Sequence, residues 1–258
     1  MDRSLWISAT GMDGQARLTE TIANNLANVN TTAFKKGNVH FQDLYYQTVT
    51  AVGAESSDSV SPVGIDLGTG SRVSGITRDF SSGSIMEKPG ELNVAIVGDG
   101  FFEIELPDGS LAYTRDGHFH RDSTGNIVTE DGYKVAGTPT LDTNATNVTI
   151  LLDGSVSVTV NNATTTAGNF QVARFPNNEG LKPIGNNLFI ETDASGTVTK
   201  GTPNENGRGG LRQGFLEGSN VDVVKEMVNM IAAQRAYEVI SKSIKTSDEM
   251  LRTATNLK

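Results

Sequence analysis

The residues with the clearest capacity for chemistry lie between Asp116 and Asp122, in the run DGHFHRD. If this run is a β-strand, alternation puts His118 and His120 on one face with both aspartates, where they could ligate a metal ion, and turns Phe119 inward. A half-buried strand with a polar outer face has the same pattern. We therefore predict no metal site here, and a metal-binding β-domain enzyme is the least favoured function.

Other motifs of catalysis are absent from the sequence. It contains no cysteine, no G-x-S-x-G elbow and no H-E-x-x-H helix. The repeated Asp-Gly pairs lack the regular spacing and the terminal glutamate of calcium loops, so we interpret them as hairpin turns. We predict no catalytic residue, no cofactor and no enzymatic activity.

Composition narrows the choice of partners. The formal net charge of -9 leaves no broad basic surface for nucleic-acid phosphates or anionic lipid. No stretch approaches the roughly 18 apolar residues that span a bilayer, and the first residues contain no signal-peptide core. We expect no nucleic-acid partner, no direct membrane insertion and no cleaved signal peptide.

Apolar residues spaced alternately by four and three predict a long helix at each end of the chain. The helices are expected from about Ser4 to Val29 and from about Val221 to Thr253, the second capped by Ser219 or Asn220. Gly11 and Gly14 weaken the first. Its stripe comprises Leu5, Ala9, Met12, Ala16, Thr19, Ala23 and Leu26, and the second helix has Val223, Met227, Met230, Tyr237, Ile244 and Leu251, with Gln234, Ser241 and Asp248 in register.

The second helix carries another apolar stripe, formed by Val224, Val228, Ile231 and Ile240. A helix that is apolar over so much of its circumference must bury more than one face. The two end helices therefore pair inside one monomer, or their extra faces pack against other subunits.

Between the helices, period-two alternation and short turns predict antiparallel β-structure. The segments Thr48 to Thr69 and Lys200 to Gly214 have little periodicity and are interpreted as extended linkers. The predicted fold class is α+β, with terminal helices packed as a coiled-coil-like unit around extended linkers and a central β domain. The predicted domains are 1–36 with 216–258, the connecting region 37–93 with 200–215, and the β domain 94–199.

Three segments resemble the bacterial flagellar rod and hook family. Ile22 to Lys36 (IANNLANVNTTAFKK) is similar to its N-terminal signature, with Ala33 where the family usually has glycine. Gly98 to Gly117 and Gly218 to Leu251 are similar to its β domain and its C-terminal helix. The opening RSLWISATGM, the length and the stretch Tyr45 to Pro62 are most like the distal-rod branch; proximal-rod and hook-type subunits are the alternatives.

The resemblance implies a helical homopolymer in the basal body, spanning periplasm to outer membrane, which transmits motor torque and encloses the export channel. Implied partners are further copies of the chain, proximal rod proteins, hook or hook-junction subunits, the L and P ring proteins and the flagellar type III export apparatus. Export without a cleaved signal peptide follows from the same resemblance.

In this family the end helices pack between subunits, so the resemblance implies an interface on both of them. Tyr45 to Pro62 is expected to stiffen the rod. The predicted interface residues are Leu5, Met12, Ala23, Asn24, Asn25, Leu26, Asn28, Val223, Met227, Val228, Met230, Ile231, Gln234, Arg235, Tyr237, Ile244 and Leu251.

Overall fold

The computed structural model describes residues 3–50, 55–56, 59–60, 63–143, 145–161 and 163–256. It divides into two compact units, which are described separately. The helical unit contains the chain up to Ala27, Gly37–Arg78 and the chain from Asp222 on, and the β unit contains Asn28–Lys36 and Asp79–Val221.

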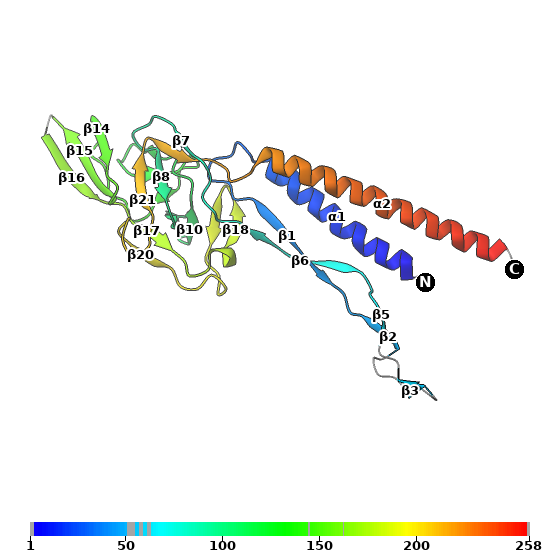
Figure 1. Cartoon of the computed structure of the whole chain (residues 1–258). Helices are drawn as coiled ribbons and strands as arrows, with labels where there is room; N and C mark the ends of the chain where they lie inside the picture. Colours follow the sequence, from blue (N-terminus) through cyan, green and yellow to red (C-terminus); the bar gives the residue numbers. More distant parts are fainter. Residues whose placement is uncertain are drawn as a thin grey trace. The chain divides into compact units, whose positions relative to one another are not determined.

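Two long helices dominate the helical unit, α1 (Arg3–Ala27) and α2 (Val223–Asn256). They lie side by side and run in opposite directions, as Figure 1 shows. Both predicted helices are therefore confirmed, with ends within three residues of those expected. Their pairing supports the predicted coiled-coil-like unit.

The N-cap of α2 is Asp222, whose Oδ1 accepts the backbone N–H of Val224 at 3.0 Å and of Lys225 at 3.2 Å. The predicted cap at Ser219 or Asn220 is wrong. Three capping residue types occur within four positions here, and the helix begins after the last of them. The side chain of Asn220 instead donates to the backbone of the β unit, at Asp79 O.

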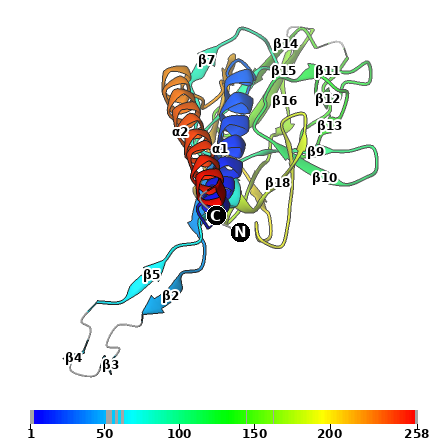
Figure 2. The same ribbon diagram turned by 90° about the vertical axis from the view of Figure 1, so that its right-hand side faces the viewer.

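An antiparallel ribbon completes the helical unit (Figure 2). β1 (Gly37–Asp43) pairs with β6 (Ser71–Arg78), followed outward by the pair β2 (Gln47–Thr50) and β5 (Ile65–Leu67) and the pair β3 (Glu55–Ser56) and β4 (Ser59–Val60). These strands lie in the predicted connecting region, and they pair with one another instead of forming free linkers.

The β unit is built on a seven-stranded antiparallel sheet and a three-stranded one. The larger has the order β11-β12-β13-β9-β10-β19-β18, and the smaller the order β14-β15-β16. Their strands are β9 (Phe102–Glu105), β10 (Leu111–Thr114), β11 (His120–Arg121), β12 (Ile127–Val128), β13 (Lys134–Val135), β14 (Asn147–Ile150), β15 (Ser155–Val160), β16 (Ala163–Asn169), β18 (Lys182–Gly185) and β19 (Leu188–Ile190).

Three shorter antiparallel pairs complete this unit, together with the 3-10 turn η1 (Asn178–Gly180). The pairs join β7 (Ile85–Glu87) to β22 (Phe215–Glu217), β8 (Val94–Val97) to β21 (Gly210–Gln213), and β17 (Val172–Arg174) to β20 (Thr199–Gly201). The predicted antiparallel β-structure between two helices, and with it the α+β class, is confirmed.

The core of the β unit comes from the inward positions of these strands. Val94, Phe102 and Val156 have no exposed surface, and the ring of Phe102 packs edge to face on that of Phe119 at a centroid distance of 5.0 Å. Phe119 is buried, as strand alternation predicted. This core removes its apolar side chains from water without help from another chain.

Ala33 lies in the left-handed region, with φ of 57°, and is buried. Its N–H donates to the carbonyl of Glu217 at 2.8 Å. A Cβ is unfavourable at positive φ, which explains why glycine suits this position. The turn after α1 therefore keeps the conformation that a glycine would adopt, at some cost in strain.

Candidate assembly surface

The contact between α1 and α2 runs along the whole of α1. Near the start of α1 the hydroxyl of Ser4 lies 3.2 Å from that of Ser247, and near its end the Nδ2 of Asn25 donates to Glu226 at 3.3 Å. Between these points Gly11 faces Ile240. The antiparallel register is therefore continuous.

The two glycines that weaken α1 as an isolated helix are explained by close approaches. A Cβ on Gly11 would meet the Cδ1 of Ile240 at 3.4 Å, and one on Gly14 would lie only 2.9 Å from the Cε1 of Phe41 on β1. The first glycine faces α2 and the second faces the ribbon. α1 is thus covered on two sides within its own unit.

Asn25 joins α1, β1 and α2 at the end of the helix pair. Its side chain accepts the N–H of Gly37 at 2.8 Å, donates to the carbonyl of Gly37 at 3.0 Å and donates to the carboxylate of Glu226. Both Asn25 and Glu226 are more than nine-tenths buried. Asn25 was predicted as an interface residue, and its side chain makes these hydrogen bonds within its own subunit.

The most buried positions of α2 are separated by multiples of seven residues, in a different register from the predicted seam. Glu226, Ala233 and Ser247 are its buried positions, and on α1 the buried side chains are Ile22 and Asn25. Polar and small residues occupy this face because the helices approach closely there. The predicted apolar stripes found this side only in part, because Met230, Ile240 and Ile244 are half-buried beside these positions, whereas Met227, Val228 and Ile231 are exposed.

The predicted interface residues consequently fall into two groups. Half-buried or buried within the unit that contains them are Leu5, Met12, Asn25, Leu26, Asn28, Met230 and Ile244. Exposed to solvent are Ala23, Asn24, Val223, Met227, Val228, Ile231, Gln234, Arg235, Tyr237 and Leu251. Arg235 and Glu238 form an exposed ion pair of 3.0 Å within α2.

Exposed apolar side chains gather on the outer face of the helical unit. Val224, Met227, Val228 and Ile231 are 72%, 52%, 60% and 57% exposed. The predicted interface omitted Trp6, Val224, Val239 and Met250, although each is more than half exposed. Of these, Val224 belonged to the second apolar stripe, which was the available signal.

The proposed stiffening segment is described only in part. Tyr45 is 86% exposed, just before β2, and Val63, on the returning side of the ribbon, is 72% exposed. Pro62 lies outside the described residues. A two-stranded ribbon with exposed apolar side chains is marginally stable alone, so this one has surface to offer a neighbour.

A buried ion triad in the β unit was not found from the sequence. The carboxylate of Glu217 accepts from Lys35 Nζ at 2.7 Å and from Arg115 Nε at 2.9 Å, and all three residues are buried. Lys35 also donates to Ser81 O at 2.8 Å. Lys35 and Arg115 are 182 and 102 residues away from Glu217 along the chain, so no local motif predicts the cluster.

Burial and charge oppose each other in this triad. Burial by itself would raise the pKa of Glu217, but the charges and hydrogen bonds of Arg115 and Lys35 hold this pKa below its usual value. Burial lowers the pKa of Lys35 despite its carboxylate partner. The triad connects the segment after α1 to β22, which leads toward α2.

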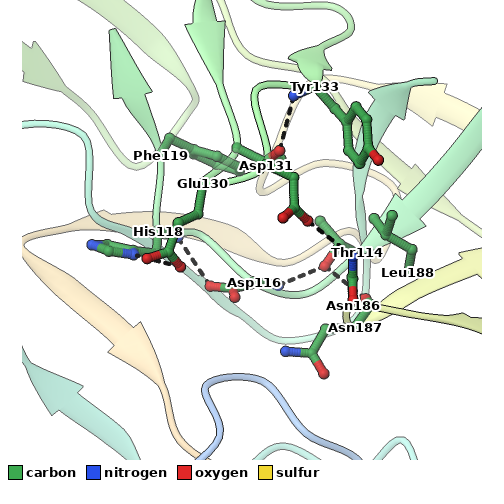
Figure 3. A pocket seen from close by; sticks show the side chains of 11 residues that line it. Thr114, Asp116, His118, Phe119, Glu130, Asp131, Tyr133, Asn186, Asn187 and Leu188 are labelled. Carbon is green, nitrogen blue, oxygen red and sulfur yellow. Dashed lines mark hydrogen bonds and ion pairs between the residues drawn. The ribbon is translucent and has the colours of Figure 1, made fainter. Parts of the chain in front are cut away.

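The histidine run lies at a small polar cavity of about 250 Å³ in the β unit (Figure 3). The rings of His118 and His120 are 4.8 Å apart, and His118 Nδ1 lies 4.0 Å from a carboxylate oxygen of Glu130. Burial raises the pKa of Asp116, which accepts the N–H of His118. Across the described residues, no three histidine, aspartate or glutamate side chains are grouped to hold a metal ion.

Neither helix, over the residues that the structure describes, has an apolar stretch long enough to cross a bilayer.

Family models match three parts of the chain. Residues 5–35 match "Flagella basal body rod protein", residues 95–158 match "Flagellar hook protein FlgE/F/G D1 domain", and residues 212–257 match "Flagellar basal body rod FlgEFG protein C-terminal". The first and last of these cover the helix pair. The middle match covers most of the two large sheets.

Curated relatives extend this similarity over the full length. The chain is 46% identical over 257 residues to the flagellar basal-body rod protein FlgG of Buchnera aphidicola subsp. Acyrthosiphon pisum, covering 98% of the chain and 99% of the relative. It is 43% identical over 260 residues to FlgG of Caulobacter vibrioides, covering 99% of each. It is 33% identical over 258 residues to FlgF of Caulobacter vibrioides, covering 98% of the chain and 97% of the relative.

Proposed function

The chain belongs to the flagellar basal-body rod family and is a structural subunit of the rod, and on this premise we propose that it builds the distal rod. Its copies polymerise into a rigid hollow shaft that encloses the export channel and transmits motor torque to the hook. Its role is structural and not catalytic.

One observation carries the distal assignment. Against two rod proteins of the same organism, Caulobacter vibrioides, the chain is 43% identical to FlgG but 33% identical to FlgF, over nearly the same length. Both relatives are full-length matches, so the difference is not caused by a missing domain. FlgG is the distal rod protein, so the higher identity to FlgG favours the distal-rod branch that the sequence resemblance indicated.

The exposed apolar face of α2 supports polymerisation. Val224, Met227, Val228 and Ile231 are each more than half exposed, and four such side chains on one face typically mark an interaction site. We propose that the exposed members of the predicted interface contact neighbouring copies directly. Asn25 contributes indirectly, by holding α1, β1 and α2 together.

The proposed location is the periplasm-spanning part of the basal body, reached without a cleaved signal peptide through the type III export apparatus. Proximal rod proteins lie below, hook or hook-junction subunits above, and the L and P rings around the shaft. Immunogold electron microscopy of purified basal bodies, with antibody against the β unit, tests this. Label just below the hook is expected; label on the hook, or beside the inner membrane, contradicts the distal assignment.

The segment Tyr45 to Pro62 is proposed to stiffen the shaft by lying against adjacent subunits. The exposure of Tyr45 supports this, because 86% of this residue lies in solvent. Deleting the segment should leave a polymer that bends more easily, measured as persistence length in electron micrographs. An unchanged persistence length would exclude this role.

The competing hypothesis, a metal-binding function of the β unit, can be tested separately. Purified protein is analysed by mass spectrometry for metal content beside a double variant, His118→Ala with His120→Ala. Stoichiometric metal in the parent that disappears in the variant would favour a metal-binding function; equal background metal in both is expected.

A further inference from the structure

We propose that the buried triad of Lys35, Arg115 and Glu217 sets the order in which the β unit is completed. The segment Asn28–Lys36 docks onto the unit only once β22, which carries Glu217, is in place. This segment lies between α1 and β1 in the sequence, yet it belongs to the β unit. Such an order is a property of the single chain and goes beyond the proposed function.

Asn28–Lys36 is held in the β unit by residues much later in the chain. The N–H of Ala33 donates to the backbone carbonyl of Glu217 at 2.8 Å. The N–H of Lys36 donates to the side-chain oxygen of Asn220 at 2.8 Å, across a sequence separation of 184 residues. The segment is thus the first part of the β unit in the chain, and these hydrogen bonds need almost the last part.

Docking of the segment buries the ammonium of Lys35. This side chain has no exposed surface, and its Nζ donates to Glu217 Oε1 at 2.7 Å and to the carbonyl of Ser81 at 2.8 Å. The nearby carboxylate of Asp79 is paired with Lys36, at 3.4 Å. Burying an ammonium without a carboxylate partner is strongly unfavourable. Until Glu217 is in place, the segment is therefore more stable in water than docked.

The β unit itself orients the carboxylate that receives this ammonium. The Oε1 of Glu217 also accepts the N–H of Gly83 at 2.9 Å, and its Oε2 accepts Arg115 Nε at 2.9 Å. The Nη1 of Arg115 in turn donates to the carbonyls of Gly98 at 2.7 Å and Gly100 at 2.9 Å. Pairing of β22 with β7 therefore brings Glu217 into a position that is fixed without the segment.

The main core of the β unit also forms without the segment. The buried residues of this core run from Val94 to Leu211, so all of them lie between the segment and β22 in the chain. The two large sheets can therefore pack first. We infer the order sheets, then β22 with Glu217 and Arg115, then the segment with Lys35.

Hydrogen exchange of the full chain, measured by mass spectrometry, tests whether docking depends on the charge of Glu217. Glu217→Gln keeps the shape of the side chain but offers one acceptor oxygen to two cations. Amide protection of residues 33–36 should fall by at least about tenfold, while β9 and β10 keep theirs. Unchanged protection of residues 33–36 would overturn the proposal.

Glu103→Gln is the matched control. Glu103 is also buried in the β unit, and its carboxylate accepts Lys200 Nζ at 2.6 Å. This variant loses a buried carboxylate that has no part in the triad, so residues 33–36 should keep their protection. An equal loss of protection there in both variants would show that general weakening of the unit is the cause, and would overturn the proposal.

A double variant separates the charge of Lys35 from the shape of the site. In Lys35→Met with Glu217→Gln, the glutamine oxygen is free to accept from Arg115, and no ammonium is buried. Methionine is flexible and fills a similar space. Protection of residues 33–36 should recover to within about threefold of the parent. If it stays as low as in Glu217→Gln alone, the buried ammonium is not what controls docking, and the proposal fails.

Refolding of the unsubstituted protein tests the order directly, and it gives the answer even if Glu217→Gln does not fold. The chain is diluted from urea and labelled with short pulses of deuterium at increasing times. Peptides from β9 and β10 should gain protection first, and residues 33–36 no earlier than residues 215–217. Protection of residues 33–36 before β22 would overturn the proposed order and leave the proposed function standing.

Discussion

The β unit encloses its core side chains, whereas the helical unit leaves apolar side chains exposed on α2. In the β unit Val94, Phe102 and Val156 have no exposed surface, and even the charged side chains of Lys35 and Glu217 are enclosed. In the helical unit α1 is covered by α2 and the ribbon, whereas α2 keeps an apolar face in solvent. The β unit buries its core within a single chain, and we propose that neighbours cover the exposed face of the helical unit.

This difference indicates where stability and assembly are encoded. Substitutions inside the β unit should change the free energy of unfolding of the isolated subunit. Substitutions on the outer face of α2 should change polymerisation and leave the subunit folded. The following experiments probe that separation, beginning with the largest expected change in subunit stability.

Glu217→Ala should have the largest effect. It leaves the buried ammonium of Lys35 and guanidinium of Arg115 without their carboxylate, and breaking a buried ion pair costs about 3–5 kcal/mol. Urea unfolding followed by circular dichroism measures the loss. Glu238→Ala removes a partner of the exposed pair with Arg235 and should cost under about 1 kcal/mol. Equal losses of unfolding free energy in both variants would show that the triad stabilises the subunit no more than an exposed ion pair does.

Acid should act through the same carboxylate. The pKa of Glu217 is depressed in the folded protein, so its contribution is present above the usual glutamate pKa and is lost as pH falls through the lower folded value. The raised pKa of Asp116 acts with the opposite sign. The difference in unfolding free energy between the parent and Glu217→Gln, measured from pH 7 down to pH 3, should therefore shrink with acidity. A difference independent of pH would contradict this linkage.

Substitutions at Ala33 should change the free energy of unfolding by a smaller amount, in a direction that the structure predicts. Valine at this left-handed, buried position is expected to cost about 2 kcal/mol, because a β-branched side chain is strongly disfavoured at positive φ. Glycine should stay within about 1 kcal/mol of the parent, since relief of strain offsets the loss of a buried methyl. Thermal unfolding of the three proteins checks this order, and a valine variant as stable as the parent would argue against the left-handed turn.

Substitutions on the exposed apolar face of α2 should have the smallest effect on the stability of the isolated subunit. Replacing Val228 and Ile231 by serine removes exposed apolar groups, which changes the free energy of unfolding by about 0.5 kcal/mol or less. Swimming in soft agar should nevertheless be lost, because the interface is gone. A folded double variant that assembles and swims normally would show that the exposed apolar face of α2 is not needed for assembly.

Much of the architecture could be predicted from local sequence. The end helices follow from four-three spacing, which reports the period of an α-helix directly, and the β-strands follow from alternation between turns rich in Asp-Gly. The special turn at Ala33 was signalled by the glycine usual in the family. These features depend on residues that are close in sequence.

Only the tertiary structure decided which residues meet. Asn25, Glu226 and Ala233 are among the most buried residues of the helix pair, because close approach selects small side chains and satisfied polar groups, which apolar periodicity does not mark. The triad of Lys35, Arg115 and Glu217 joins three distant segments, and a single buried charge in the sequence does not name its partner. By itself, the sequence determined which elements form and that apolar surface exceeds what two helices bury; folding in three dimensions determined which part of that surface is left for another molecule.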